Sequence, residues 1–305
     1  MKAAAQRLGP ALGVLLCACW LPAVALAQLS GDIIGESTLY VADGEDTLLD
    51  VARDHDLGVL EVMAANPGVD PWVPGHGTPV LLPTAHILPD APRRGIVINL
   101  AELRLYYFPP KGAPWSTAIG IGREAFTTPL GTTQVVRKQA DPTWFPTASA
   151  RAENPDLPAA VPPGPANPLG KYALYLGWNS YLIHGTNKPY GVGRRVSRGC
   201  IRLYPEAIAR LFQEVKVGTT VTVVAESVKL GWHDGELYLE AHPEIEQLDI
   251  LEETGAFPLL ETVGLDERII AAAGEAAGRL DWPVVQAALT QRRGTPVRIT
   301  LLAGT

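Results

Sequence analysis

Cysteine is scarce in this sequence, with three among 305 residues. Cys17 and Cys19 lie in an apolar N-terminal stretch, so the rest of the chain holds only Cys200. An internal disulfide in that part is excluded, because it needs a pair of cysteines. A structural zinc site usually takes about four nitrogen or sulfur ligands. With one thiol and scattered histidines we expect no metal, and no motif predicts another cofactor. Cys200 is then a buried apolar side chain, an intermolecular bridge or a reactive thiol.

Positive charge is also in short supply. Lys and Arg number 25 against 32 Asp and Glu, a net charge of −7. A basic surface is typical of proteins that bind nucleic acids, so we expect no nucleic-acid partner. No apolar run after the N-terminal stretch is long and uncharged enough to span a membrane, so we expect no span in the mature chain. The 30 glycines and 27 prolines favour short strands and many turns.

The N-terminus has the pattern of a secretory signal. Lys2 and Arg7 precede an uncharged apolar run from Ala11 to about Val24, and Ala25-Leu26-Ala27 follows. This order predicts a signal peptide over residues 1–27, cleaved after Ala27. Two alternatives remain: the run is long enough to stay as a membrane anchor, and the Leu16–Cys19 segment resembles a lipobox that would acylate Cys19. The small residues before Gln28 favour simple cleavage and export.

Residues 38–84 predict a small module of the order strand, helix, helix, strand. Leu48, Val51 and Ala52 follow helical spacing, a second helix runs from Leu60 to Ala65, and a strand covers Pro79 to Leu82. The YVADGEDTL start, the AANP helix end and the G-x(4)-VLLP close resemble the lysin motif (LysM). That resemblance implies binding to glycan strands that contain N-acetylglucosamine, such as peptidoglycan. The alternative is an unrelated small α/β module.

Residues 95–226 predict a mainly β domain. Apolar alternation and turn signals mark several strands, and one clear helix begins at Pro205. The segment from Asp141 to Pro168 is rich in proline and predicts a long loop of the kind that is often functional. Residues 84–94 read as a proline-containing linker. The predicted strands are Ile96–Leu100, Leu103–Phe108, Ser116–Ile121, Thr132–Arg137, Tyr172–Leu176, Tyr181–Ile183 and Thr220–Val224.

Residues 227–305 predict a small α/β subdomain. A hairpin turns at His233-Asp234-Gly235, and helices are expected over Asp266–Arg279 and Val284–Arg293, before a strand from Val297 to Leu302. Nothing in the pattern of this tail indicates chemistry.

The stretch HGTNKPYGVGRRVSRGCIRL, from His184 to Leu203, carries the candidate catalytic residues. A thiol must lose its proton to attack, and an imidazole within reach can accept that proton and later protonate a leaving amine. Cys200 and His184 fit these two roles. Gly185 would let the chain turn after the histidine. Gly199 removes a side chain beside the thiol, and its amide with that of Cys200 would hold an oxyanion.

Two further groups of residues fit a substrate cleft. The planar guanidinium of Arg202 suits a substrate carboxylate, and Trp144 and Tyr190 stand in loops where they would line the cleft. From residue types alone, a buried cysteine beside a core histidine explains Cys200 and His184 equally well.

The same stretch resembles the signature HG…S-x-G-C-[IV]-[RN] of the L,D-transpeptidase family (YkuD-type domain). Here it reads His184-Gly185 and then Ser197-Arg198-Gly199-Cys200-Ile201-Arg202, with arginine where the family often has histidine. INLAELRLYYFP, TPLG, DPTWFPT, NPLGKYALYLG and KVGTTVTVV resemble its ErfK/YbiS branch. The resemblance implies a β-rich catalytic domain with Cys200 as nucleophile and His184 as base. It makes Gly199 part of the oxyanion site, Arg202 and Ser197 supporting residues, and a backbone carbonyl or hydroxyl the orienting group.

The resemblance also implies a substrate. Cys200 would cleave the diaminopimelate–D-Ala bond of a peptidoglycan tetrapeptide stem and transfer the acyl group to an amine, in the periplasm. The branch favours the C-terminal lysine of an outer-membrane lipoprotein as acceptor. Diaminopimelate on a second stem (a 3–3 cross-link) and water (carboxypeptidase activity) are alternatives, and carbapenems would acylate the same thiol. A different hypothesis is a non-enzymatic protein that binds the wall through the LysM-like module.

Overall fold

A computed structural model describes residues 31–123, 127–258 and 264–302. The fold is mainly β, as the sequence predicts. The expected signal peptide, residues 1–27, lies outside the described residues. Among the residues that are described, no helix is long and apolar enough to cross a membrane.

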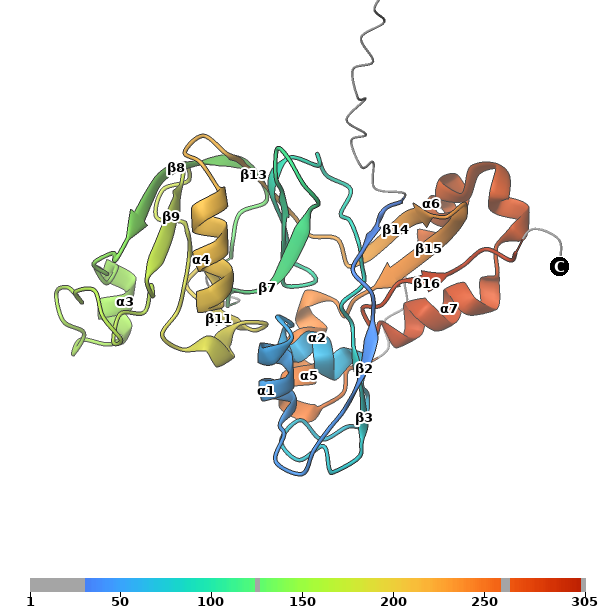
Figure 1. The fold of residues 1–305 in the computed structure, drawn as a ribbon, viewed down its shortest axis with the longest axis horizontal. Coiled ribbons are helices and arrows are strands. Elements are labelled where there is room, and N and C mark those ends of the chain that lie inside the picture. The colour runs from blue at the N-terminus through green and yellow to red at the C-terminus, as the bar shows by residue number, and fades with distance from the viewer. Residues whose placement is uncertain (1–30, 124–126, 259–263, 303–305) are drawn as a thin grey trace, which may run out of the picture.

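Nine strands of the described chain form one sheet, in the order β11-β7-β12-β10-β9-β8-β13-β5-β6. An additional pairing of β6 with β7 closes this sheet into a barrel, which lies on the left of Figure 1. Helix α4 (Pro205–Glu214) covers the outside of the barrel. The strands are β5 (Gly95–Asn99), β6 (Arg104–Phe108), β7 (Trp115–Gly122), β8 (Gly131–Ala140), β9 (Tyr172–Leu176), β10 (Leu182–His184), β11 (Arg195–Ser197), β12 (Ile201–Leu203) and β13 (Thr220–Val224).

The strands β5 and β6 are apolar on both faces because both faces are covered. Side chains alternate along a strand, and Ile96 and Ile98 enter the main hydrophobic core. Val97, between them, packs in a second cluster with Tyr106 and Phe108 of β6. This explains the apolar runs IVI of β5 and LYYF of β6, since a strand with one solvated face would alternate with polar residues.

The N-terminal module has the predicted order: β2 (Thr38–Val41), α1 (Leu48–Asp54), α2 (Val59–Ala65) and β3 (Pro79–Leu82). The Thr47 hydroxyl caps α1 by accepting a hydrogen bond from the Asp50 amide at 3.1 Å. Asn66 ends α2, and its side chain accepts from the Leu81 amide at 2.7 Å, which ties the helix to β3. The apolar faces of both helices belong to the same core as the barrel interior.

The C-terminal part contains one helix that the sequence reading missed. Helix α5 (Ile245–Thr254) leaves its own subdomain and packs beside α2, where Leu248 and Leu251 join the main core. The remaining elements form a separate hydrophobic cluster on the right of Figure 1. They are β14 (Val228–His233), β15 (Glu236–Ala241), α6 (Leu265–Ala273), the 3₁₀ helix η2 (Gly274–Arg279), α7 (Trp282–Gln291) and β16 (Val297–Arg298). Within the described part of residues 227–305, α5 packs on the main core and the other elements form a cluster of their own.

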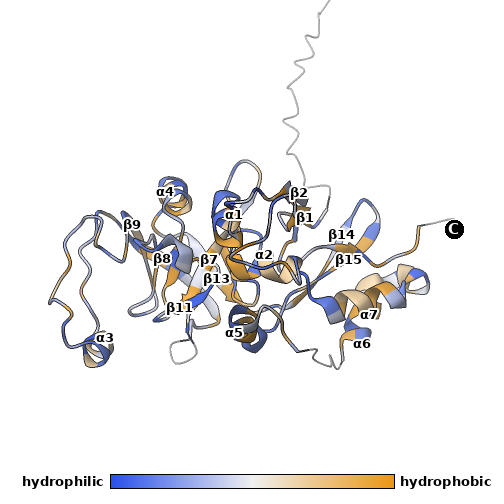
Figure 2. Cartoon of the chain, turned by 90° about the horizontal axis from the view of Figure 1, so that it is seen from below, coloured by the Kyte–Doolittle hydropathy of each residue, from blue (hydrophilic) through white to orange (hydrophobic). Residues whose placement is uncertain are grey.

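The expected linker, residues 84–94, is also partly built into the fold. It contains β4 (His86–Ile87), which pairs antiparallel with β1 (Ile33–Ile34). His86, Ile87 and Leu88 are all buried. Figure 2 shows hydrophobic ribbon gathered around α2 and the neighbouring barrel strands, and hydrophilic ribbon on the outer turns. The N-terminal module, the barrel and α5 thus share one hydrophobic interior.

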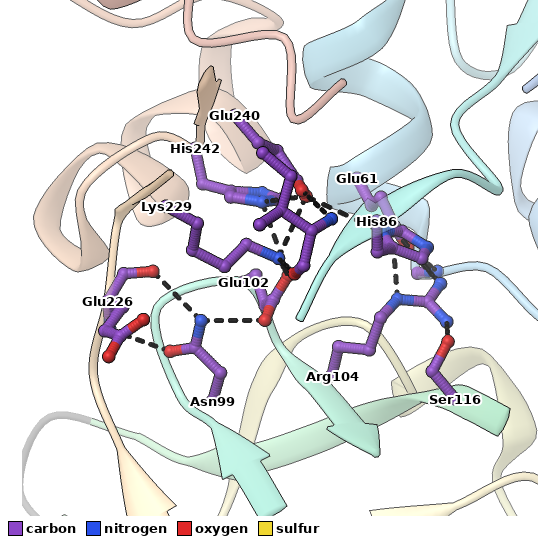
Figure 3. Close-up of polar contacts among 12 residues, drawn as sticks. Glu61, His86, Asn99, Glu102, Arg104, Ser116, Glu226, Lys229, Glu240 and His242 are labelled. Carbon is purple, nitrogen blue, oxygen red and sulfur yellow. Dashed lines mark hydrogen bonds and ion pairs between the residues drawn. The ribbon is translucent and has the colours of Figure 1, made fainter. Parts of the chain in front are cut away.

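A cluster of buried charged side chains lies where these parts meet (Figure 3). Arg104 of β6 pairs with Glu61 of α2 at 2.8 Å between Nη2 and Oε2. The Lys229 ammonium of β14 lies 2.5 Å from Glu102 and 3.1 Å from Glu240. These ion pairs join the N-terminal module, the barrel and the C-terminal subdomain. A buried ion pair adds modest net stability but is costly to break.

The same cluster places His86, Glu102 and Glu240 so that one ligand atom of each lies within 4.8 Å of the others. A metal would have to share this space with the Lys229 ammonium, which already contacts both carboxylates. The cation of this cluster is therefore a side chain of the protein.

Candidate active site

Strands β10 and β12 bring the candidate catalytic residues together. They run parallel, with Ile183 opposite Ile201 and His184 opposite Arg202. Side chains of paired residues point to the same face, and residues two apart on a strand share a face. Cys200, two residues before Arg202, therefore projects toward the face that carries His184. Both side chains line a hollow of about 490 Å³.

The His184 ring is buried and held in one orientation. Its Nδ1 lies 2.5 Å from the carbonyl oxygen of Gly185. A carbonyl only accepts, so this contact requires the proton on Nδ1 and leaves the lone pair on Nε2. The Gly185 carbonyl thus occupies the place of the orienting group. A Cβ at Gly185 would lie 3.1 Å from Ile208 and 3.4 Å from the Leu169 carbonyl, so a side chain there would crowd the turn.

Burial and one nearby cation set the protonation of the pair. Burial and, to a smaller extent, the positive charge of Arg202 lower the pKa of His184 to about 4, although the hydrogen bond to Gly185 opposes both effects. Burial raises the pKa of the Cys200 thiol, while a hydrogen bond from the Leu182 backbone and the Arg202 charge partly offset this. Both shifts disfavour charge, so at neutral pH the resting pair is a neutral thiol and a neutral imidazole.

Ser197 organises the loop that carries the thiol. Its buried hydroxyl donates to the Cys200 carbonyl at 2.6 Å and accepts from the Gly199 amide at 3.1 Å. The Thr128 hydroxyl donates to the Gly199 carbonyl at 2.9 Å. Gly199 has φ +96°, a left-handed conformation that favours glycine. In this conformation the Gly199 amide has a partner inside the loop, unlike the free oxyanion donor expected from the sequence.

The long loop from Asp141 to Pro168 forms one wall of the hollow. It contains the short helix α3 (Ala148–Glu153), which the sequence reading did not predict. The Glu153 carboxylate contacts Arg123 at 2.5 Å and also pairs with Arg198, in the Ser197–Cys200 loop. The wall is therefore tied directly to the segment that holds Cys200.

Asn167 closes the base of this loop. Its buried side-chain amide donates to the Pro142 carbonyl at 2.7 Å and to the carbonyls of Val161 and Pro162, each at 3.1 Å. The asparagine gave no signal as a functional residue in the sequence. Its role depends on three carbonyls that lie together only in the folded loop.

A second hollow of about 710 Å³ adjoins the first. Both hollows are lined by Trp144, Pro168 and Arg202, so they meet beside β12, the strand that carries Arg202. Tyr190 lines only the second, and its hydroxyl donates to Asp50 of α1 at 2.9 Å. The N-terminal module thus contacts the rim of the cleft.

The site residues expected from the sequence divide into three groups. Cys200, His184, Ser197, Arg202 and Trp144 line the first hollow. Tyr190 belongs to the second hollow, with Trp144 and Arg202 again. Gly185 and Gly199 contribute backbone atoms: the Gly185 carbonyl contacts the His184 ring, and the Gly199 amide donates to the Ser197 hydroxyl. The sequence reading missed Glu153, Arg123 and Asp50, because their partners are distant along the chain and surface charges carry no distinctive pattern.

Comparison with known proteins gives the class to which this fold and site belong. The family profile described as the L,D-transpeptidase catalytic domain, YkuD, matches residues 93–223. Among curated proteins, the chain is 43% identical over 256 residues to "Probable L,D-transpeptidase YbiS" of Escherichia coli, covering 81% of each chain. It is 40% identical over 278 residues to "Probable L,D-transpeptidase ErfK/SrfK" of the same species, covering 88% of this chain and 87% of that one.

Among solved structures, the catalytic domain of the E. faecium L,D-transpeptidase is 25% identical with a TM-score of 0.35, over 44% of this chain and 99% of that chain. The identity and coverage of the curated relatives establish the family. This protein belongs to the L,D-transpeptidase family.

Proposed function

We propose that this protein is a peptidoglycan L,D-transpeptidase that uses Cys200 as its nucleophile. The observation that carries the proposal is the hollow shared by Cys200 and His184, with His184 oriented by the Gly185 carbonyl. The family acts on peptidoglycan stem peptides. The scissile bond is then the amide between the L-centre of diaminopimelate and the terminal D-Ala of a tetrapeptide stem.

The proposed reaction has two half-reactions. His184 Nε2 takes the thiol proton as Cys200 Sγ attacks the amide carbonyl, and the same proton is returned to the leaving D-Ala nitrogen. The stem remains as a thioester on Cys200. An acceptor amine then gives its proton to His184, attacks the thioester, and restores the thiol. The thioester preserves the energy of the cleaved amide, so transfer needs no nucleotide.

The neutral resting pair suits this sequence of proton transfers. A thiolate formed only during attack needs a base at that moment, and His184 is deprotonated at neutral pH because its pKa is about 4. The developing oxyanion needs donors that are free to turn toward it. The Gly199 amide already donates a hydrogen bond to the Ser197 hydroxyl. We therefore assign the Cys200 amide as the first donor to the oxyanion, and the Gly199 amide becomes a second donor when the Ser197 hydroxyl moves away from it.

We propose a lipoprotein C-terminal lysine as the acceptor, on the basis of the similarity to YbiS and ErfK/SrfK. Diaminopimelate and water are the competing acceptors. Catalytic residues do not distinguish them, since the thioester reacts with any amine or water that reaches it. We propose that the protein acts in the periplasm, because the signal peptide predicted from the sequence would export it there.

We also propose that the N-terminal module is a LysM-type unit that binds the glycan strand. The feature that supports this is a group of exposed apolar side chains: Leu39, Val41, Trp72 and Val73 are each more than 60% exposed. Asp70 accepts hydrogen bonds from the Trp72 and Val73 amides at 2.8 and 3.0 Å, which fixes the turn that presents them. An exposed indole provides a flat apolar face on which a sugar ring can stack.

The catalytic proposal is tested with defined tetrapeptide muropeptides and purified protein. Intact mass should show an acyl-enzyme, and free D-Ala should appear. Cys200→Ala should abolish both the acyl-enzyme and the release of D-Ala, and His184→Gln should lower the acylation rate about 10²-fold to 10⁴-fold. Product yield that survives Cys200→Ala would refute the cysteine mechanism. Adding a peptide ending in lysine identifies the acceptor: dimeric stems without any lysine adduct would refute lipoprotein attachment and leave the transpeptidase intact.

A further inference from the structure

The second hollow is strongly basic in a protein whose net charge is −7. Lys188, Arg194 and Arg202 contribute to its lining, and among the described residues that line it there is no aspartate or glutamate. Its other walls are largely apolar, including Leu157, Pro158 and Val196. Cations grouped in a concave apolar surface attract anions, because the low-dielectric walls concentrate the field.

Both arginines of this hollow have a hydrogen-bond donor without a partner among the described residues. The Nε atoms of Arg194 and Arg202 are buried and have no hydrogen-bond partner among the described residues. A buried donor without a partner is costly, and a carboxylate that bonds to it removes that cost. Arg194 also contacts Glu252 of α5 at 3.4 Å, so part of its charge is compensated. Lys188 is exposed at the rim and stands four residues after His184.

The backbone around Lys188 is held by several contacts. Its amide donates to the Thr186 hydroxyl at 2.9 Å, and its carbonyl accepts from the Gly191 amide at 3.1 Å. The neighbouring Asn187 side chain donates to the Ala166 carbonyl at 3.1 Å, and Tyr190 is tied to Asp50. The loop is therefore fixed on both sides of Lys188, and the ammonium is presented from a positioned backbone.

We infer that the second hollow binds the donor stem and that Lys188, with Arg194, recognises its free carboxylates. This inference rests on the proposed function. A tetrapeptide stem carries free carboxylates on its glutamyl residue, on diaminopimelate and on the terminal D-Ala that leaves, whereas the acceptor presents an amine whose protonated form the three cations would repel. The first hollow suits the acceptor better, because its Arg198 is paired with Glu153 and its other arginine, Arg202, is shared by both hollows.

The test follows acylation of the full chain by intact mass, as a function of stem concentration and without acceptor. Lys188→Gln should lower the second-order acylation rate about 1.5-fold to fivefold for the free-acid stem, the range for an exposed charged contact. A stem whose glutamyl and diaminopimelate carboxylates are amidated should react equally with wild type and Lys188→Gln. About 0.5 M salt should reduce the difference seen with the free-acid stem, since screening weakens an exposed charge pair. Lys216→Gln changes an exposed lysine that follows α4 and lines neither hollow, so it is the matched control and should behave as wild type.

Each outcome decides one question. If wild-type protein forms no acyl-enzyme, the proposed function fails before the carboxylate assignment is reached. If wild type acylates and Lys188→Gln matches it on the free-acid stem, the assignment is wrong. An equal loss on free-acid and amidated stems would show a structural effect of the substitution, and it would also overturn the assignment.

Discussion

His184 lies directly opposite Arg202 across the parallel pair of β10 and β12. A permanent positive charge therefore stands beside the imidazole and opposes its protonation, in the same direction as burial. The arginine has two effects: its charge helps to keep the His184 imidazole neutral at neutral pH, and it lowers the pKa of the Cys200 thiol, against the effect of burial. Both effects lead to predictions for the dependence on pH.

The acid limb of the pH profile should report His184. Its pKa is about 4, so the imidazole is protonated, and unable to accept the thiol proton, only as pH falls through that value. The rate constant kcat/KM for D-Ala release should stay nearly flat from about pH 7 to 5 and then fall. Arg202→Gln removes a charge that lowers this pKa, so the limb should move to higher pH, whereas Arg210→Gln should not move it. A wild-type limb near pH 6.5, the usual histidine value, would contradict this.

Alkylation of the free enzyme should show that Cys200 is a protonated thiol at rest. Burial raises its pKa, so the thiolate fraction at pH 7 is smaller than that of an ordinary cysteine. The rate with iodoacetamide should therefore keep rising above about pH 8.5. The urea-denatured chain serves as the control, with its inflection near the ordinary value. A plateau of reactivity below pH 7 in the folded enzyme would indicate a preformed thiolate instead.

Ser197→Ala should destabilise the loop from Ser197 to Cys200. The hydroxyl bonds both the Gly199 amide and the Cys200 carbonyl, and its loss leaves two buried backbone groups without this partner. An unsatisfied buried group costs about 1–3 kcal/mol, so we expect a lower melting temperature and an acylation rate reduced roughly tenfold or more. Thr132→Ala removes an exposed hydroxyl on β8, outside both hollows, and is the control. Full activity and stability in Ser197→Ala would show that the bridge is dispensable.

Lys229→Met should weaken the junction of the three parts of the chain. The substitution keeps most of the side-chain volume but leaves Glu102 and Glu240 facing each other without their cation (Figure 3). Removing one partner of a buried pair costs about 3–5 kcal/mol, so the midpoint of urea unfolding should fall clearly.

Two comparisons make the result specific. Adding Glu102→Gln to Lys229→Met should recover part of the loss, because one of the two uncompensated charges is then gone. Glu206→Gln removes the exposed pair with Arg53 and should change stability by less than about 1 kcal/mol. If Lys229→Met lowers the free energy of unfolding no more than Glu206→Gln does, the role assigned to Lys229 is wrong.

Binding to the glycan should depend on the exposed turn of the N-terminal module. Trp72→Ala and Val73→Ala, placed in the full-length Cys200→Ala protein, should reduce sedimentation with purified sacculi, since both side chains are more than 60% exposed. Val217→Ala changes an equally exposed apolar residue of the barrel and is the control. Unchanged sedimentation of the Trp72 variant would separate this turn from any glycan site.

The local sequence determined much of the fold and the identity of the chemistry. Apolar alternation predicted β5, β6, β9 and β13 almost residue by residue, because a strand buried on one or both faces leaves a short-range pattern. The HG…SRGC stretch marked Cys200 and His184 as candidate catalytic residues for the same reason: the two residues and their neighbouring glycines are close in the chain. The family profile and the curated relatives place the chain in the family that this stretch indicated.

Tertiary structure alone decided the contacts between distant segments. Helix α5 packs on α2 about two hundred residues away in the chain, and Glu153 joins Arg123 to Arg198. The buried ion pairs of Lys229 and the basic lining of the second hollow likewise come from segments far apart. A charged residue looks the same in the sequence whether it is solvated or paired, because its burial, its partners and its pKa depend on the neighbours that folding supplies.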